Sequence, residues 1–264
     1  IVDILIVCLL LACVLIPLIH IVAASFSNPS LFVGHKGILL WPEGFSLASY
    51  QAVFKNTFLW TGYANTLFIV IVGTVLNVLL SMVAAYCLSR KHVAAGPTIM
   101  KLLVFTMYFS GGMIPLYLVV KGVGLYGSRW ALILPTLVDT YNLIIMRTAF
   151  AGVPDSLEES AKLDGANAWT ILWRIMAPLV KPTVAVITLY YAVSHWNSWF
   201  NAMLILRQIL IQNDTADMTA GADYLVSETI QYATVVVATL PILCIYPFVQ
   251  KYFVKGVMIG AIKG

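Results

Sequence analysis

Long apolar stretches dominate the sequence. Stretches without Asp, Glu, Lys or Arg cover residues 4–35, 56–89, 102–120, 182–206 and 229–250, and a sixth, 130–146, is interrupted only by Asp139. A membrane-spanning helix needs about 20 predominantly apolar residues. The pattern therefore predicts an all-α membrane protein. Its six transmembrane helices are expected at about 4–24, 63–89, 99–120, 130–150, 182–200 and 231–253.

The composition excludes a soluble globule and a disordered chain. Hydrophobic residues make up 61% of the 264 residues and charged residues only 10%, whereas a soluble domain carries about 25% charged residues. Disordered chains are poor in apolar residues. We expect one transmembrane domain over residues 1–264. The first apolar stretch, 4–24, exceeds the 7–15 residues of a signal-peptide core, so we expect a retained span.

The basic residues predict the orientation in the membrane. With six spans both termini share one side, and ten of the 15 Lys and Arg residues then lie on that side and five on the other. Because cytoplasmic loops carry an excess of Lys and Arg, both termini are expected in the cytoplasm. The net charge of +4 is thus explained by topology, and no nucleic-acid partner is expected.

The cysteines give no sign of a disulfide or a metal site. Cys8, Cys13, Cys87 and Cys244 all lie in apolar stretches, and no two of them form a C-x-x-C pair. Free cysteine often behaves as a small apolar packing residue, which is the role we expect here.

The longest predicted cytoplasmic loop, 151–181, carries helix signals. Ser156 and Glu159 stand three residues apart, the spacing of a capping box, and predict a helix that begins near Leu157. Gly165 can end that helix in the left-handed conformation. The loop is therefore expected to contain a helix and a glycine corner.

A second short helix is expected after this corner, with Asn167 as its N-cap and Pro178 at its end. An apolar stripe runs along it at helical spacing: Trp169, Leu172, Trp173 and Met176. Helices of about two turns are marginal in water, so the stripe must pack on something. Either it lies on the inner surface of its own chain, or it enters a groove on a partner.

The loop resembles the signature of the permease subunits of binding-protein-dependent ABC importers. That signature is Glu-Ala-Ala, three residues, Gly, nine residues, Ile, one residue and Leu-Pro. Here Glu159-Ser160-Ala161, Gly165, Ile175 and Ala177-Pro178 stand at this spacing, with Ser160 and Ala177 as departures.

Further motifs are similar to the carbohydrate-uptake branch of that family and to its oligosaccharide and polysaccharide permeases. They are Asn65-Thr66-Leu67, Ala84-Ala85-Tyr86, Gly112-Met113-Ile114-Pro115, His195-Trp196-Asn197, Tyr246-Pro247-Phe248 and the end from Gly260 to Gly264. The resemblance covers nearly the whole chain.

The resemblance implies a type I ABC importer permease fold in a bacterial cell membrane. In that family the 155–178 loop docks in a cleft on a cytoplasmic ATPase, and closure of the ATPase dimer on ATP drives alternating access. The residues expected to couple are Glu158, Glu159, Ala161, Asp164, Gly165, Trp169, Ile175 and Pro178.

The resemblance also implies partners: a second, different permease subunit, two ATPase subunits that hold ATP and Mg, and an extracellular or periplasmic sugar-binding protein. This chain is expected to bind no cofactor and to be no enzyme, because it has no G-x-x-x-x-G-K-[ST] phosphate loop. The outer loop, 201–230, resembles the family's contact with the binding protein, although it can also be a solvated loop.

Asp139 is the charged residue deepest in a predicted span. Intramembrane acids are costly and are candidates for function. Pro135 and Asn142 stand nearby, and Gly111-Gly112 weakens the third predicted span at a similar depth. Broken backbone in a membrane is tolerated where it lines a cavity, so Asp139 and Asn142 are candidates for the substrate path. Alternatively, Asp139 makes a structural hydrogen bond to a neighbouring helix or to a partner subunit.

The outer end of the fifth predicted span offers further path candidates: Trp196, Asn197, Trp199 and Asn201. Aromatic rings and amides suit the C–H faces and hydroxyls of sugars. The alternative is an aromatic belt at the membrane interface.

The sequence thus favours an oligosaccharide importer subunit over two other classes. An ion-gradient-driven secondary transporter would depend on Asp139, but such proteins usually show repeats and ion-binding networks, and neither is evident. A membrane enzyme would need clustered catalytic groups. No G-x-S-x-G or H-E-x-x-H motif occurs, and Glu158 and Glu159 point to different helix faces.

Overall fold

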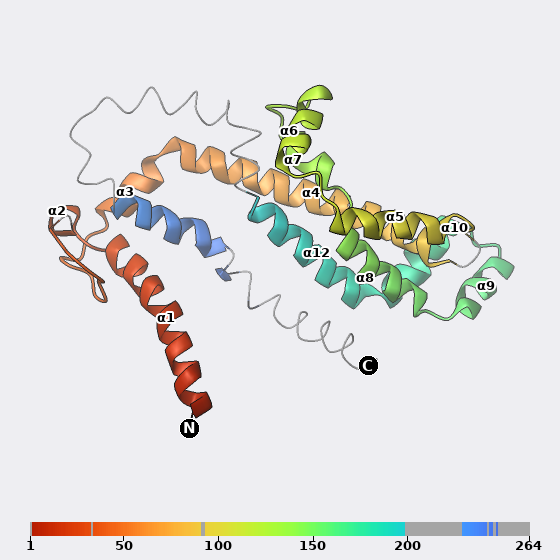
Figure 1. The fold of residues 1–264 in the computed structure, drawn as a ribbon, viewed down its shortest axis with the longest axis horizontal. Helices are drawn as coiled ribbons and strands as arrows, with labels where there is room; N and C mark the ends of the chain where they lie inside the picture. The colour runs from red at the N-terminus through yellow and green to blue at the C-terminus, as the bar shows by residue number, and fades with distance from the viewer. Residues whose placement is uncertain are drawn as a thin grey trace. The chain divides into compact units, whose positions relative to one another are not determined.

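The fold is built from helices. The computed structural model describes residues 2–32, 34–90, 93–198, 229–241, 243–244 and 247. Every regular element in these residues is a helix (Figure 1), which confirms the predicted all-α class. The chain groups into two compact units, one made of residues 1–63 and 214–247 and the other of residues 64–213 and 248–264.

Two described helices are long and apolar enough to cross a membrane, Val2–Ser25 and Leu59–Ser89. Two helix pairs qualify only when each is taken as one bent span. Within the described residues the chain therefore holds two to four spans by length and composition. The count of six stays a prediction, and most of the predicted sixth span beyond Pro241 lies outside the described residues.

The first unit holds the N-terminal helix and the segment after it. Its elements are α1 (Val2–Ser25), α2 (Pro29–Phe32), α3 (Ala48–Lys55), the first turns of α4 (Thr57–Ser89) and a helix over Thr229–Pro241. The helix that carries the predicted second span, α4, begins at Thr57, six residues before the predicted start at about residue 63. The apolar stretch over 56–89 already includes these residues.

The segment after α1 folds back on itself. Asn28 N donates to the carbonyl of Glu43 at 2.9 Å, and Ser46 N donates to the carbonyl of Phe26 at 2.8 Å. In the same unit, the Tyr63 hydroxyl donates to the carbonyl of Val237 at 2.7 Å. These bonds satisfy polar groups near the ends of the apolar helices.

The second unit contains the rest of α4 and a series of shorter helices. They are α5 (Gly96–Tyr108), α6 (Met113–Gly122), α7 (Trp130–Ile133), η1 (Leu134–Thr136), α8 (Thr140–Ala151), α9 (Asp155–Leu163), α10 (Ala168–Thr170), η2 (Ile171–Met176), α11 (Ala177–Leu179) and α12 (Lys181–Trp196). The largest core lies where the Ser89 end of α4 meets α8, α9 and α12 (Figure 1). Met146, Phe150, Met176 and Ile187 are completely buried there.

The predicted third span, 99–120, is not one helix. It divides into α5 and α6, which are bent by 117° at the break. Gly112 adopts a φ of +81° at this point, a conformation that glycine reaches without steric cost. The glycine pair that the sequence analysis expected to weaken the helix interrupts it completely.

The predicted fourth span, 130–150, is also interrupted, between η1 and α8. Pro135 has no N–H, so it cannot continue the helical bonding. The Thr136 hydroxyl donates to the carbonyls of Leu132 and Ile133 at 3.0 and 3.1 Å. The first α8 residue, Thr140, follows Asp139, whose carboxylate accepts from Asn142 N at 2.9 Å and caps the helix.

Candidate functional site

The loop over 151–181 begins with α9, a nine-residue helix. The predicted capping box is wrong: α9 begins at Asp155, and Pro154 occupies the N-cap position without a side-chain bond. Proline has a fixed φ, and here it sets the entry to the helix. Asp155 and Glu158 lie in the first turn and Lys162 in the last, an arrangement that complements the helix dipole.

The predicted glycine corner after α9 is confirmed. Gly165 has a φ of +80°, and Ala166 N donates to the carbonyl of Ala161 at 2.9 Å, the long closing bond of a Schellman motif. Asn167 then caps the next helix, because its side-chain oxygen accepts from Thr170 N at 2.8 Å. The corner therefore fixes the angle between two helices of the loop.

The helix after the corner differs from the prediction at its end. It continues through α10, η2 and α11 to Leu179, so Pro178 lies inside it and does not end it. The six residues of η2 form a π-helix. Because proline lacks an N–H and crowds the carbonyl four residues earlier, the wider π-turn accommodates Pro178. The chain then bends by 88° into α12.

The wider turn also divides the predicted apolar stripe. Leu172 and Met176 are buried in the core that holds α8 and α9. Trp169 is 62% exposed and Trp173 is 38% exposed. One half of the stripe therefore packs on its own chain, as the first alternative expected. The other half is accessible, and its entry into a groove on a partner stays a prediction.

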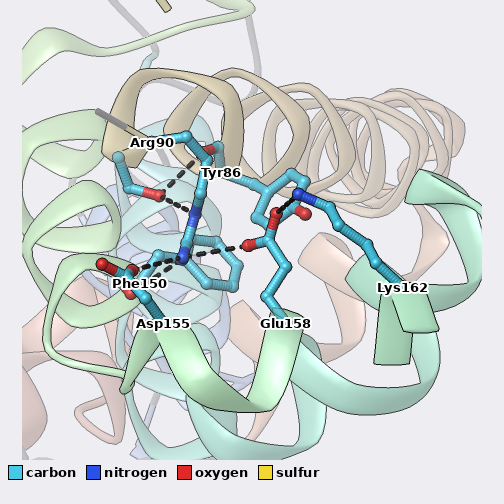
Figure 2. A network of polar contacts seen from close by, with 7 residues as sticks. Tyr86, Arg90, Phe150, Asp155, Glu158 and Lys162 are labelled. Carbon is cyan, nitrogen blue, oxygen red and sulfur yellow. Dashed lines mark hydrogen bonds and ion pairs between the residues drawn. The ribbon is translucent and has the colours of Figure 1, made fainter. Parts of the chain in front are cut away.

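A buried ion-pair network holds the first turn of α9. Figure 2 shows Glu158 between two cations, with its carboxylate 3.0 Å from Arg90 Nη1 and 2.8 Å from Lys162 Nζ. The side chains of Arg90 and Glu158 are each 6% exposed. Burial opposes ionisation of Glu158, but the Lys162 hydrogen bond and the charge of Arg90 outweigh it, so the pKa of Glu158 is lowered.

Arg90 reaches beyond Glu158. Its Nη2 donates to the carbonyl of Phe150 at 3.0 Å, its Nη1 lies 3.4 Å from Asp155, and its guanidinium lies 5.1 Å from the centre of the Tyr86 ring. These contacts come from the ends of α4 and α8 and from α9 (Figure 2). The sequence analysis counted Arg90 only for topology, because its partners are distant in sequence.

The opposite side of α9 is exposed. Leu157 and Leu163 are 43% and 89% exposed, and Glu159 and Asp164 are exposed as well. As predicted, Glu158 and Glu159 point to different faces. The other expected coupling residues divide between the two sides: Ala161 is buried, Ile175 is half-buried, and Gly165 and Pro178 are exposed.

The candidates for the substrate path lie in different places. Asp139 is the N-cap of α8 and Asn142, which it binds, is buried. Trp196 and Asn197 lie at the end of α12, where the Asn197 side chain donates to the carbonyl of Val193 at 3.0 Å. Trp199 and Asn201 lie outside the described residues.

A cavity of about 330 Å³ opens beside this end of α12. Leu116, Ala131, Leu132, Pro135, Thr136, Ser194, His195, Asn197 and Ser198 line it. Of the predicted path residues in the described part of the chain, the cavity includes Asn197. Asp139, Asn142 and Trp196 are not part of its lining.

The sequence also matches a family of known proteins. The model of the inner membrane component of binding-protein-dependent transport systems matches residues 77–259. The chain belongs to this family. The family consists of inner membrane components of transport systems, and the long apolar helices of this permease agree with a location in a membrane.

Known transport permeases match this permease in sequence over nearly its whole length. A polygalacturonan/rhamnogalacturonan transport system permease protein of Bacillus subtilis is 44% identical over 271 residues, which cover 96% of this chain and 94% of the relative. An arabinooligosaccharides transport system permease protein of Halalkalibacterium halodurans is 28% identical over 258 residues, 94% of this chain and 91% of the relative.

A solved structure also resembles the permease. One chain of a bacterial ABC transporter involved in the import of the acidic polysaccharide alginate has a TM-score of 0.84 and 32% identity, covering 96% of this chain and 95% of that chain. The predicted importer permease fold and the predicted resemblance to sugar permeases are therefore confirmed.

Proposed function

We propose that this permease forms half of the translocation path of an ATP-driven oligosaccharide importer. In this proposal the loop over 155–178 docks on a cytoplasmic ATPase subunit, and ATP-driven closure of that subunit switches the path between inward and outward access. Both chain termini lie in the cytoplasm. ATP and Mg²⁺ are held by the partner subunits.

The observation that carries this proposal is the exposed side of the 151–181 loop, which faces away from the core of the chain. On α9 it presents Leu157, Leu163 and Glu159, and after the glycine corner it adds Trp169. Apolar and aromatic side chains this exposed favour a protein partner. The inner side is anchored through Glu158. A short helix with one fixed face and one free face is suited to the helix-in-groove mode of binding.

The proposed substrate is an oligosaccharide released from a polysaccharide. The names of two relatives refer to polygalacturonan, rhamnogalacturonan and alginate, so acidic oligosaccharides are the first to test. The cavity beside α12 presents the polar side chains of Ser194, Asn197 and Ser198, which can hydrogen-bond to sugar hydroxyls. We propose that the residues around this cavity form part of the wall of the translocation path.

Six predicted spans leave the path incomplete, so a second, different permease subunit is proposed as the other half. An external sugar-binding protein delivers the substrate, with the outer loop 201–230 as its proposed contact. That loop lies outside the described residues. The family description itself, a component of binding-protein-dependent transport, supports the binding protein and the ATPase as partners.

A charge on the exposed face of α9 tests the proposal. Leu163→Glu alters a side chain that is 89% exposed, so the permease should still fold. We expect the variant to lose co-purification of the ATPase and sugar-stimulated ATP hydrolysis. Ala94→Glu, an exposed position in the turn before α5, adds the same charge on the same predicted side as the control. Wild-type assembly and hydrolysis in Leu163→Glu would overturn the proposal.

A further inference from the structure

Two arginines connect α4 and α8 reciprocally: each binds a backbone carbonyl at the end of the other helix. Arg90, directly after α4, donates from Nη2 to the carbonyl of Phe150 in the last turn of α8 at 3.0 Å. Arg147 of α8 donates from Nε to the carbonyl of Leu88 in the last turn of α4 at 2.9 Å. Last-turn carbonyls have no partner within their own helix, and a cation at this end is favoured by the helix dipole. The exchange therefore joins α4 and α8 at one end.

Arg90 also joins α9 to this pair of helices. The same guanidinium contacts Glu158 at 3.0 Å and Asp155 at 3.4 Å. Lys162 also contacts Glu158, but it belongs to α9 itself and is 53% exposed, so it links no second helix. Arg90 is thus the charged group shared by α4, α8 and α9 in this network (Figure 2).

Burial gives these contacts their strength. A buried ion pair is costly to break, because removal of one partner leaves an uncompensated charge in a medium of low dielectric constant. Arg90 and Glu158 are each 6% exposed. Nearby, Ala161 packs in the same apolar core as Met146 and Phe150. A short helix such as α9 is marginal alone, and these two kinds of contact fix its inner face.

We propose that Arg90 and Arg147 form a clasp that makes α9 and the adjoining ends of α4 and α8 move as one body, with Arg90 as a positioning residue for coupling. This inference rests on the proposed docking of α9 on an ATPase. A displacement of α9 by the ATPase then passes directly into α4 and α8. Further along α4, the side chain of Asn77 donates to the carbonyl of Thr136 beside the break in the fourth predicted span, so α4 also contacts the segment that precedes α8.

The functional test compares Arg90→Gln with Lys101→Gln in the complete reconstituted importer. Lys101 is an exposed cation of α5, outside the loop proposed to dock on the ATPase. We expect Arg90→Gln to lose most of the sugar transported per ATP hydrolysed, because α9 then moves without α4 and α8. Lys101→Gln should leave that ratio unchanged. A wild-type ratio in Arg90→Gln would overturn the positioning role.

The mechanical part of the proposal has its own test. Spin labels at Ser160 of α9 and Thr148 of α8, both exposed, report the distance between the helices in a background where the four cysteines are replaced by serine. We expect one narrow distance distribution with Arg90 and a broad one with Arg90→Gln. An unchanged narrow distribution would contradict the clasp.

Two further variants separate the possible failures. If Arg90→Gln does not assemble, Glu158→Gln removes the buried, shorter link to α9, leaves the contact with Asp155 and the bonds between α4 and α8, and should also broaden the distribution. The double variant should be no worse than Arg90→Gln alone. If the wild-type importer lacks sugar-stimulated hydrolysis, the proposed function fails, whereas the spin-label distances still decide whether the clasp exists.

Discussion

The side-chain amide of Asn77 in α4 donates a 2.8 Å hydrogen bond to the backbone carbonyl of Thr136. Close by, the hydroxyl of Tyr191 in α12 accepts from Asp139 N at 3.0 Å and shares a 2.7 Å bond with Ser81. Irregular backbone inside a membrane is tolerated where protein groups satisfy it. Side chains from α4 and α12 therefore stabilise the break in the fourth predicted span.

Replacing Asn77 tests this role. Asn77→Leu removes the donor and leaves the Thr136 carbonyl without its partner, so the free energy of unfolding should fall by about 1 kcal/mol, the scale of such bonds between membrane helices. Unfolding of the purified protein in detergent measures the loss. Leu79→Ile, an exposed position on the same helix, is the control and should change nothing. Equal stability of the two variants would contradict a stabilising role for Asn77 at this break.

Replacement of Gly73 even by alanine should destabilise the protein. A Cβ there would lie 2.6 Å from Nε2 of His195, so Gly73→Ala must displace the buried imidazole ring of His195, and overpacking of this kind costs about 1–3 kcal/mol. Gly62→Ala on the same helix meets open space and should stabilise the helix by up to about 1 kcal/mol. Relative to the wild type, the melting temperature should therefore fall in Gly73→Ala and rise in Gly62→Ala. Gly73→Ala with His195→Ala should recover part of the loss.

Replacement of Asp139 distinguishes the proposed ATP-driven importer from an ion-driven transporter. As an N-cap it accepts one backbone N–H. Asparagine can replace it in that role, and alanine should cost about 1 kcal/mol of stability. We expect Asp139→Asn to transport sugar at close to the wild-type rate in vesicles, with or without a protonophore. Loss of uptake in Asp139→Asn at full stability would favour a carboxylate that carries an ion.

Glu158 should make the attachment of α9 sensitive to acid. Its pKa is lowered from 4.5 in the folded protein, so the stability that its ionised form contributes is complete above pH 4.5 and is lost as the pH falls through the lowered value. Protease cleavage within the 151–181 loop should therefore increase at low pH in the wild type. Glu158→Gln should be cleaved faster near neutral pH and lack this dependence. Identical pH profiles would contradict the assignment.

Local patterns predicted much of the 151–181 loop. Gly165 and Asn167 act within a few residues, so their corner and cap could be recognised in the sequence and are confirmed. The capping box failed because Pro154 already sets the helix entry. Helix periodicity failed over Ile171–Met176, before Pro178, because a π-helix changes the number of residues per turn there and divides the apolar stripe.

Partners far apart in sequence could not be predicted. Arg90 binds Phe150 and Glu158, and nothing near residue 90 specifies those contacts. The same holds for Asn77 and Thr136. Asp139 illustrates the limit: the sequence analysis weighed a path residue against a hydrogen bond to a neighbouring helix, whereas the carboxylate caps its own helix through Asn142 N. Its place on the path stays a prediction.

The most direct test of the central claim is uptake by the complete importer in proteoliposomes. The chain is purified in mild detergent with its partners, reconstituted, and supplied with an oligogalacturonide, its binding protein and internal ATP. We predict co-purification of an ATPase and a second permease, and uptake that requires internal ATP and ignores a protonophore. A chain that purifies without an ATPase, with uptake that follows an ion gradient, would contradict the account.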